Sequence, residues 1–169
     1  MPLSDACHAC HLMATTGSRW RRGCSDGSLV SMTATFDSLL AGSTSPGLFD
    51  WRGDAGRDLE AEAIAAGWSA WPLDTSGVST AEGFFDEVRA AWGLPPWSDD
   101  DLNALFDALG EMAIGPCLIV WDGSGSFARS EPDLAVSVLA VLRDAVGQAD
   151  ALVVVLRGDA IVNATDGLL

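Results

Sequence analysis

The chain has 169 residues, of which 49% are hydrophobic and 20% charged, as is typical of a folded globular domain. Its 24 acidic and 9 basic residues give a formal net charge of −15, which disfavours nucleic acid and anionic membranes as partners. No apolar run is long enough to span a membrane and no secretory signal is recognisable, so the sequence favours a reduced, cytoplasmic protein.

Residues 1–33 are rich in Ser, Gly, Thr and Cys and show no sustained periodicity, which predicts a disordered or weakly ordered extension. A translation start at Met32 is an alternative interpretation. The extension contains the sequence CHACH, in which Cys7 and Cys10 have a zinc-ligand spacing beside His8 and His11. A second pair at matching spacing is missing, so we predict no metal site. A zinc-responsive protein that uses this cluster remains an alternative hypothesis.

Regular elements follow in alternation. We expect a helix over 33–41, a strand over 48–51, a helix over 57–66 that ends at Gly67, and a strand over 68–73. Ser79, with Glu82 three residues later, has the spacing of a capping box and predicts the start of the next helix, which ends at Gly93. The residues predicted to face the core from these helices are Phe36, Leu39, Leu40, Leu59, Ala63, Ile64, Phe84, Phe85, Val88, Ala91 and Trp92.

The second half of the chain contains two strands that are apolar throughout, over 117–121 and 150–156. Such runs are typical of strands covered on both faces. A helix over 132–146 lies between them, and Cys117 is expected to be a buried thiol. The fold class is therefore predicted to be α/β, a small mostly parallel sheet of three to four strands flanked by helices. We expect one domain over 34–157 and a flexible tail over 158–169.

The segment 94–110, LPPWSDDDLNALFDALG, predicts an acidic amphipathic helix. The prolines disfavour helix upstream, and Ser98 or Asp99 is the predicted cap. One face is apolar, formed by Leu102, Leu105, Phe106 and Leu109. Asp107 and Asn103 are i+4 neighbours on an exposed face.

Catalytic patterns are weak. Residues 122–126, DGSGS, read as a plain loop after a strand, because they lack both the full dinucleotide-binding pattern and the lysine of a P-loop. Both histidines lie in the extension, and the chain has neither Lys nor Tyr. A nucleophile with an adjacent base is therefore not supported, and we predict that the chain is not an enzyme and needs no cofactor.

Four segments follow one another along the chain in this order: LPPWSDDDLNALFDALGEM, PCLIVW, SVLAVLRDA and ALVVVL. Through these segments the chain resembles the barstar family, whose members are intracellular inhibitors of a secreted ribonuclease. The resemblance covers about Trp68 to Arg157, and the region from Met32 is similar to the leading segment of longer members. In that family a helix and its preceding loop plug the basic active site of the ribonuclease. The resemblance therefore implies a barstar-like fold and a basic secreted ribonuclease as partner, bound by a chain that is a monomer when free.

The resemblance also implies a set of partner-binding residues. The chief acid matches Asp107, which would stand in for a substrate phosphate, and a second inhibitory acid matches Asp144. An aromatic residue of the preceding loop matches Trp97. Three further positions differ from the family pattern: Asn103 replaces an acid, Phe106 replaces Trp and Asp101 replaces Asn. These differences leave open an interaction module of the same fold with a non-nuclease partner.

Overall fold

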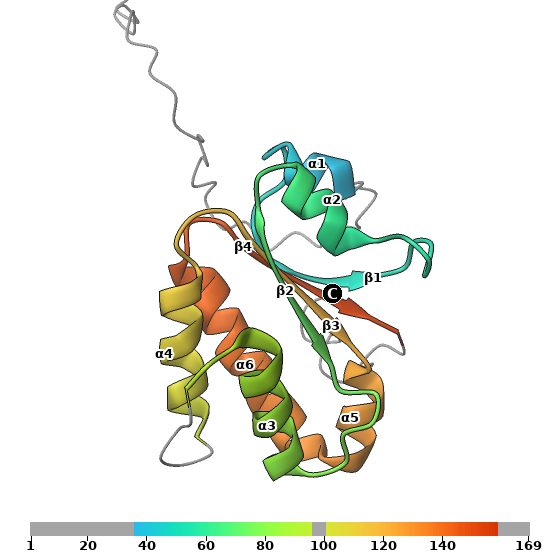
Figure 1. Cartoon of the computed structure of the whole chain (residues 1–169), viewed down its shortest axis with the longest axis vertical. Helices are drawn as coiled ribbons and strands as arrows, with labels where there is room; N and C mark the ends of the chain where they lie inside the picture. The colour runs from blue at the N-terminus through green and yellow to red at the C-terminus, as the bar shows by residue number, and fades with distance from the viewer. Residues whose placement is uncertain (1–35, 96–100, 159–169) are drawn as a thin grey trace, which may run out of the picture.

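The computed structural model describes residues 36–95 and 101–158, which form a sheet with helices on both faces (Figure 1). All pairings between its strands are parallel, and the order is β1-β4-β3-β2. The predicted α/β class is therefore confirmed. The strands are β1 (Leu48–Trp51), β2 (Ser69–Asp74), β3 (Cys117–Asp122) and β4 (Leu152–Arg157).

Among the described residues, two helices precede β2 and four follow it. They are α1 (Phe36–Leu40), α2 (Leu59–Ala65), α3 (Ala81–Trp92), α4 (Leu102–Met112), α5 (Ser124–Ser130) and α6 (Pro132–Gln148). Because α4 leads into β3 and α6 leads into β4, and these two strands are parallel neighbours, both helices run back to the amino end of the sheet. They lie beside one another in Figure 1.

Side chains of the two central strands alternate between two separate cores. Cys117, Ile119 and Trp121 of β3 pack with α3 to α6, whereas Leu118 and Val120 pack with α1 and α2. Phe84 of α3 and Phe127 of α5 stack in the larger core with ring centroids 4.8 Å apart. Both faces of the central strands are therefore dry, as their continuous apolar sequence predicted.

Several local predictions are wrong. Residues 124–130 form helix α5 instead of a plain loop, because Phe127 enters the larger core and is fully buried there. Thr80 rather than Ser79 caps α3, through a hydrogen bond from Gly83 N to Thr80 Oγ1. Ile64 is 62% exposed, because it lies a further 100° or so around α2 from the buried Ala63.

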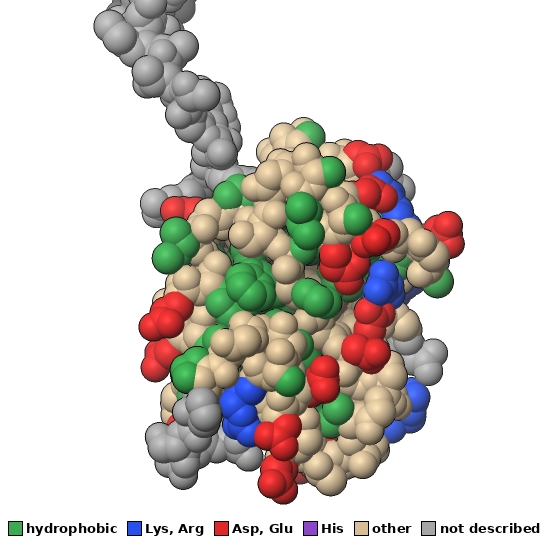
Figure 2. Space-filling model, viewed as in Figure 1, with side chains coloured by type: hydrophobic (Ala, Val, Ile, Leu, Met, Phe, Trp, Pro, Cys, Tyr) green, Lys and Arg blue, Asp and Glu red, His purple; other side chains and the backbone are tan. Residues whose placement is uncertain are grey.

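The free edge of β2 is blocked at its centre. Ser69 N donates to Pro116 O and Thr75 N donates to Asp122 O, so the alternation along the strand turns the backbone groups of Pro72 away from β3. Proline has no N–H to offer there, and Trp92 Nε1 donates to Pro72 O at 3.0 Å. In Figure 2 apolar side chains gather over this strand, in the middle of the face shown.

Candidate functional site

Helix α4 begins at a cap that involves two of the predicted site residues. Asp101 is the N-cap, and its carboxylate accepts hydrogen bonds from Asn103 N at 3.0 Å and from Asn103 Nδ2 at 2.9 Å. These hydrogen bonds from Asn103 lower the pKa of Asp101. The predicted cap at Ser98 or Asp99 is therefore wrong, because the helix begins only at Leu102. Asp101 and Asn103 lie together and orient one another.

The outer face of α4 carries Asp107 at mid-helix. Leu105, Ala108 and Leu109 are buried, while Asn103 and Asp107 are exposed as the spacing predicted. Phe106 is half-buried against the larger core. The buried residues on either side of Asp107 hold the backbone that carries its carboxylate.

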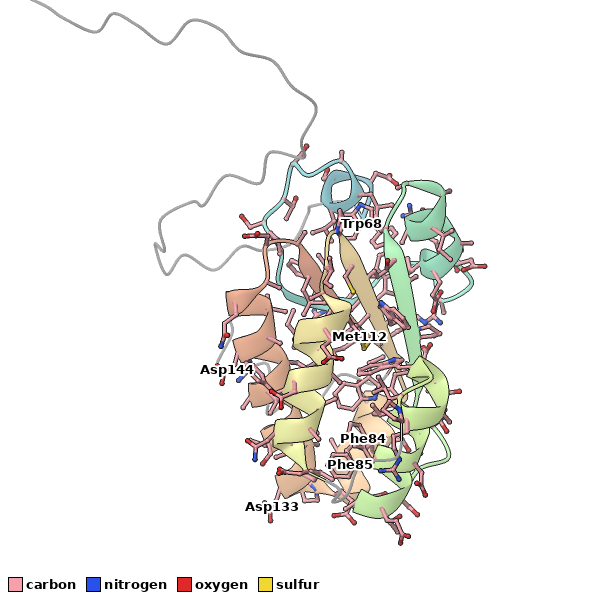
Figure 3. The ribbon with its side chains drawn as sticks, turned by 60° about the vertical axis from the view of Figure 1, so that its left-hand side comes forward. Trp68, Phe84, Phe85, Met112, Asp133 and Asp144 are labelled. Carbon is pink, nitrogen blue, oxygen red and sulfur yellow. The ribbon has the colours of Figure 1, made fainter. Side chains whose placement is uncertain are left out.

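Helix α6 brings Asp144 to the same side of the molecule. Leu142 and Ala145 are buried and Asp144 is exposed. Figure 3 shows Asp144 beside α4 in the upper half of α6, and Asp133 at the lower end of α6. Two exposed carboxylates thus stand on neighbouring helices that run in the same direction.

Acidic side chains predominate on this side. Figure 2 shows them over α4 at the left edge of the molecule. Neither α4 nor α6 has a basic residue in its last turn. A surface of this kind attracts a cationic partner and speeds its encounter.

Trp97, the remaining predicted site residue, lies outside the described residues. The CHACH cluster also lies outside them. Within residues 36–95 and 101–158, no three His, Cys, Asp or Glu are grouped as metal ligands. Over the same ranges, no helix combines the length and apolar character that crossing a bilayer requires.

The carboxyl end of the sheet holds an ion pair that the sequence analysis missed. Arg157 Nε and Nη2 donate to the two carboxylate oxygens of Asp122, each at 2.6 Å, and Arg157 Nη1 donates to Arg57 O at 3.2 Å. The Asp122 hydrogen bonds raise the pKa of Arg157. In the sequence, Asp122 directly follows the apolar run CLIVW and Arg157 directly follows ALVVVL, and this is the signal that could have identified the pair. In the structure the two residues end parallel strands in register. The pair ties β3 and β4 to the segment before α2, and it leaves Asp122 with a structural partner.

The thiol of Cys117 offers no nucleophile. It is 1% exposed at the start of β3, and burial raises its pKa to about 11. The prediction of a buried thiol is confirmed.

A second feature that the sequence analysis missed is a hollow of about 660 Å³ between the carboxyl ends of α4 and α6. Its signal in the sequence is the segment AIGPC after α4, in which an apolar residue stands among small ones. Ile114 in this segment is 86% exposed.

Comparison with known proteins accords with this geometry. The comparison with curated proteins gave no match. The family described as Barstar (barnase inhibitor) matches residues 68–159, a range that runs from the start of β2 past the end of β4 and includes α4 and α6. This range covers more than half of the 169 residues. The chain belongs to the barstar (barnase inhibitor) family.

Proposed function

We propose that the protein is a cytoplasmic inhibitor that binds the basic active site of a secreted ribonuclease and blocks it. Membership of the barstar family supports this function. The observation that carries it is the exposed carboxylate of Asp107 at the centre of α4, within the matched range. A carboxylate on a rigid helix can take the place of a substrate phosphate in a cationic cleft.

The neighbouring residues have distinct roles in this proposal. Asp144 adds a second anion from α6, and the half-buried Phe106 offers an apolar surface next to Asp107. The hydrogen bonds between Asp101 and Asn103 fix the start of the helix. Trp97 precedes this start in the sequence and would contact the same partner. No bond is made or broken, so the chain acts by occupying the site.

The test is titration of a guanyl-specific ribonuclease with the purified protein, with residual RNA cleavage and calorimetric binding as measurements. We expect Asp107→Ala and Asp144→Ala each to weaken binding. Loss of a hydrogen bond to a charged group costs about 2 kcal/mol, which is roughly thirtyfold in affinity.

Two exposed acids outside the proposed site serve as controls. Asp54 lies in the loop after β1 and Asp133 at the far end of α6 from Asp144. Asp54→Ala and Asp133→Ala should leave the affinity within about twofold, because surface charges far from an interface act only through screened fields. Equal losses of affinity in all four variants would overturn the assigned site. Absence of inhibition by the unaltered protein would overturn the function and would favour a partner that is not a nuclease.

A further inference from the structure

The hollow between α4 and α6 is open and has mainly apolar walls. It has a volume of about 660 Å³. Of the described residues that line it, Asp150 alone is charged. Side chains and backbone from both helices and from the segments that follow them form its walls, and they include Phe106, Gly110, Ile114, Ala145, Gln148 and Asp150.

Glycine keeps one wall open. A Cβ built on Gly110 has no heavy atom within 4 Å apart from its chain neighbours and the backbone of its own helix, and this residue of α4 borders the hollow. Ile114 extends the apolar surface at the rim with 86% of its area exposed. The space beside Gly110 is therefore open to an incoming side chain.

The electrostatic environment of the hollow is negative. Ala113 and Ala149, the C-caps of α4 and α6, both line it. The carboxyl end of each helix carries a partial negative charge, and neither helix has a basic residue in its last turn to offset that charge. Asp150 adds a full negative charge at the wall.

Apolar walls and a negative potential together favour one kind of guest. Arginine and lysine have an apolar stem and a cationic head, so the stem can contact the walls while the head meets the helix carboxyl ends. A purely aliphatic side chain gains nothing from the potential, and an acidic one is repelled. We propose that this hollow binds an arginine or lysine side chain of the partner protein.

The location connects this inference with the proposed function, on which the identity of the partner rests. Phe106 precedes Asp107 in α4, and Ala145 follows Asp144 in α6. The hollow therefore borders the helix segments that carry the two carboxylates, and we place it within the area that the partner covers. The basic surface of the ribonuclease would supply the side chain, beyond the residues that meet Asp107.

A matched pair of glycine variants tests the hollow. Gly110→Leu fills it, while Gly147→Leu places the same side chain on α6 at an exposed position that does not line it and is equally unobstructed. Both changes favour helix, so both variants should fold, as circular dichroism can verify. We expect Gly110→Leu to weaken ribonuclease binding by about tenfold and Gly147→Leu to leave it unchanged.

A second measurement needs no ribonuclease. The ¹⁵N-labelled protein is titrated by NMR with acetyl-Gly-Arg-Gly-amide and, separately, with the same peptide carrying norleucine in place of arginine. We expect the arginine peptide to shift the amide signals of residues 110–115 and 145–151 saturably. The norleucine peptide should shift them much less. Gly110→Leu should abolish the response, and Gly147→Leu should preserve it.

The two measurements separate the two proposals. If the unaltered protein does not inhibit the ribonuclease, the proposed function fails and the peptide titration alone decides the hollow. Localised, arginine-selective shifts that depend on Gly110 support the inference. Equal response to norleucine, shifts elsewhere on the molecule, or a response that survives Gly110→Leu overturns it.

Discussion

A single hydroxyl group links two strands deep in the larger core. Trp121 Nε1 donates to Thr75 Oγ1 at 2.8 Å, and Thr75 Oγ1 donates to Asp122 O at 3.2 Å. Thr75 and Trp121 are both fully buried. The hydroxyl therefore satisfies an indole N–H that has no access to water.

Thr75→Val removes the hydroxyl while it keeps the side-chain shape. It should destabilise the fold by about 1–3 kcal/mol, because the buried indole N–H of Trp121 then lacks an acceptor. Urea unfolding followed by tryptophan fluorescence measures the loss. Thr75→Ser retains the hydroxyl and should cost clearly less. If Thr75→Val is as stable as the unaltered protein, the hydrogen bond to Trp121 does not contribute to the stability of the fold.

Residue-level predictions from the sequence succeeded where one helix face decides the outcome. The spacing in α4 correctly predicted that Asp107 is exposed and Leu105 buried. It could not predict the contact between Thr75 and Trp121, which are 46 positions apart. Such a pair depends on strand order and register, which periodicity within one segment does not encode.

At the scale of elements, the start of α4 shows why caps are hard to predict. The sequence offers Ser98, Asp99, Asp100 and Asp101 in succession, and each has a side chain that can cap. Asp101 is the cap because the helix begins at Leu102, whose partly buried side chain packs against the larger core. Tertiary packing thus selects among equivalent caps. The two central strands, β3 and β4, were easier to predict, since their apolar runs have few alternative interpretations.

The cap gives α4 a pH dependence. The hydrogen bonds from Asn103 lower the pKa of Asp101 in the folded state, so the carboxylate stabilises the fold above its unfolded pKa. This contribution is lost as the pH falls through the lowered folded value. Asp101→Asn retains an acceptor but has no charge to titrate. At pH 7 we expect the unaltered protein to have a larger free energy of unfolding than Asp101→Asn. This difference should shrink below about pH 4.

Acid titration of unfolding free energies checks this expectation. Asp101→Ala serves as the control, because it removes the acceptor at every pH. If the difference in unfolding free energy between the unaltered protein and Asp101→Asn stays constant from neutral to acid pH, the charge does not have the role assigned to it.

The whole molecule extends beyond the range that identifies its family. The match begins at Trp68, yet α1, β1 and α2 precede it. These elements cover one face of the sheet, including Leu118, Val120, Val153 and Val155, all of which are buried. Arg157 adds a polar tie through its hydrogen bond to Arg57 O. The leading elements are thus part of the core.

A chain that starts at Trp68 should therefore expose this apolar face. Leaving one of these four side chains in water forgoes about 1.5–3 kcal/mol of the stabilisation that its burial provides. We expect that truncated chain to bind the dye ANS and to aggregate in size-exclusion chromatography. A chain that starts at residue 34 retains the leading elements and should elute as a folded monomer. If the two chains behave alike, the leading segment is dispensable and the boundary predicted at residue 34 is wrong.

The blocked centre of β2 also bears on how the molecule meets others. A new strand could add to the sheet only at β2 or at β1, which are its two edge strands. At β2 Pro72 lacks an N–H and its carbonyl is already engaged by Trp92, while β1 has only four residues. Short and proline-bearing edges resist pairing between chains. A partner is therefore expected to meet side chains of the helices and of the loops beside them, where substitution can change the partner without altering the sheet.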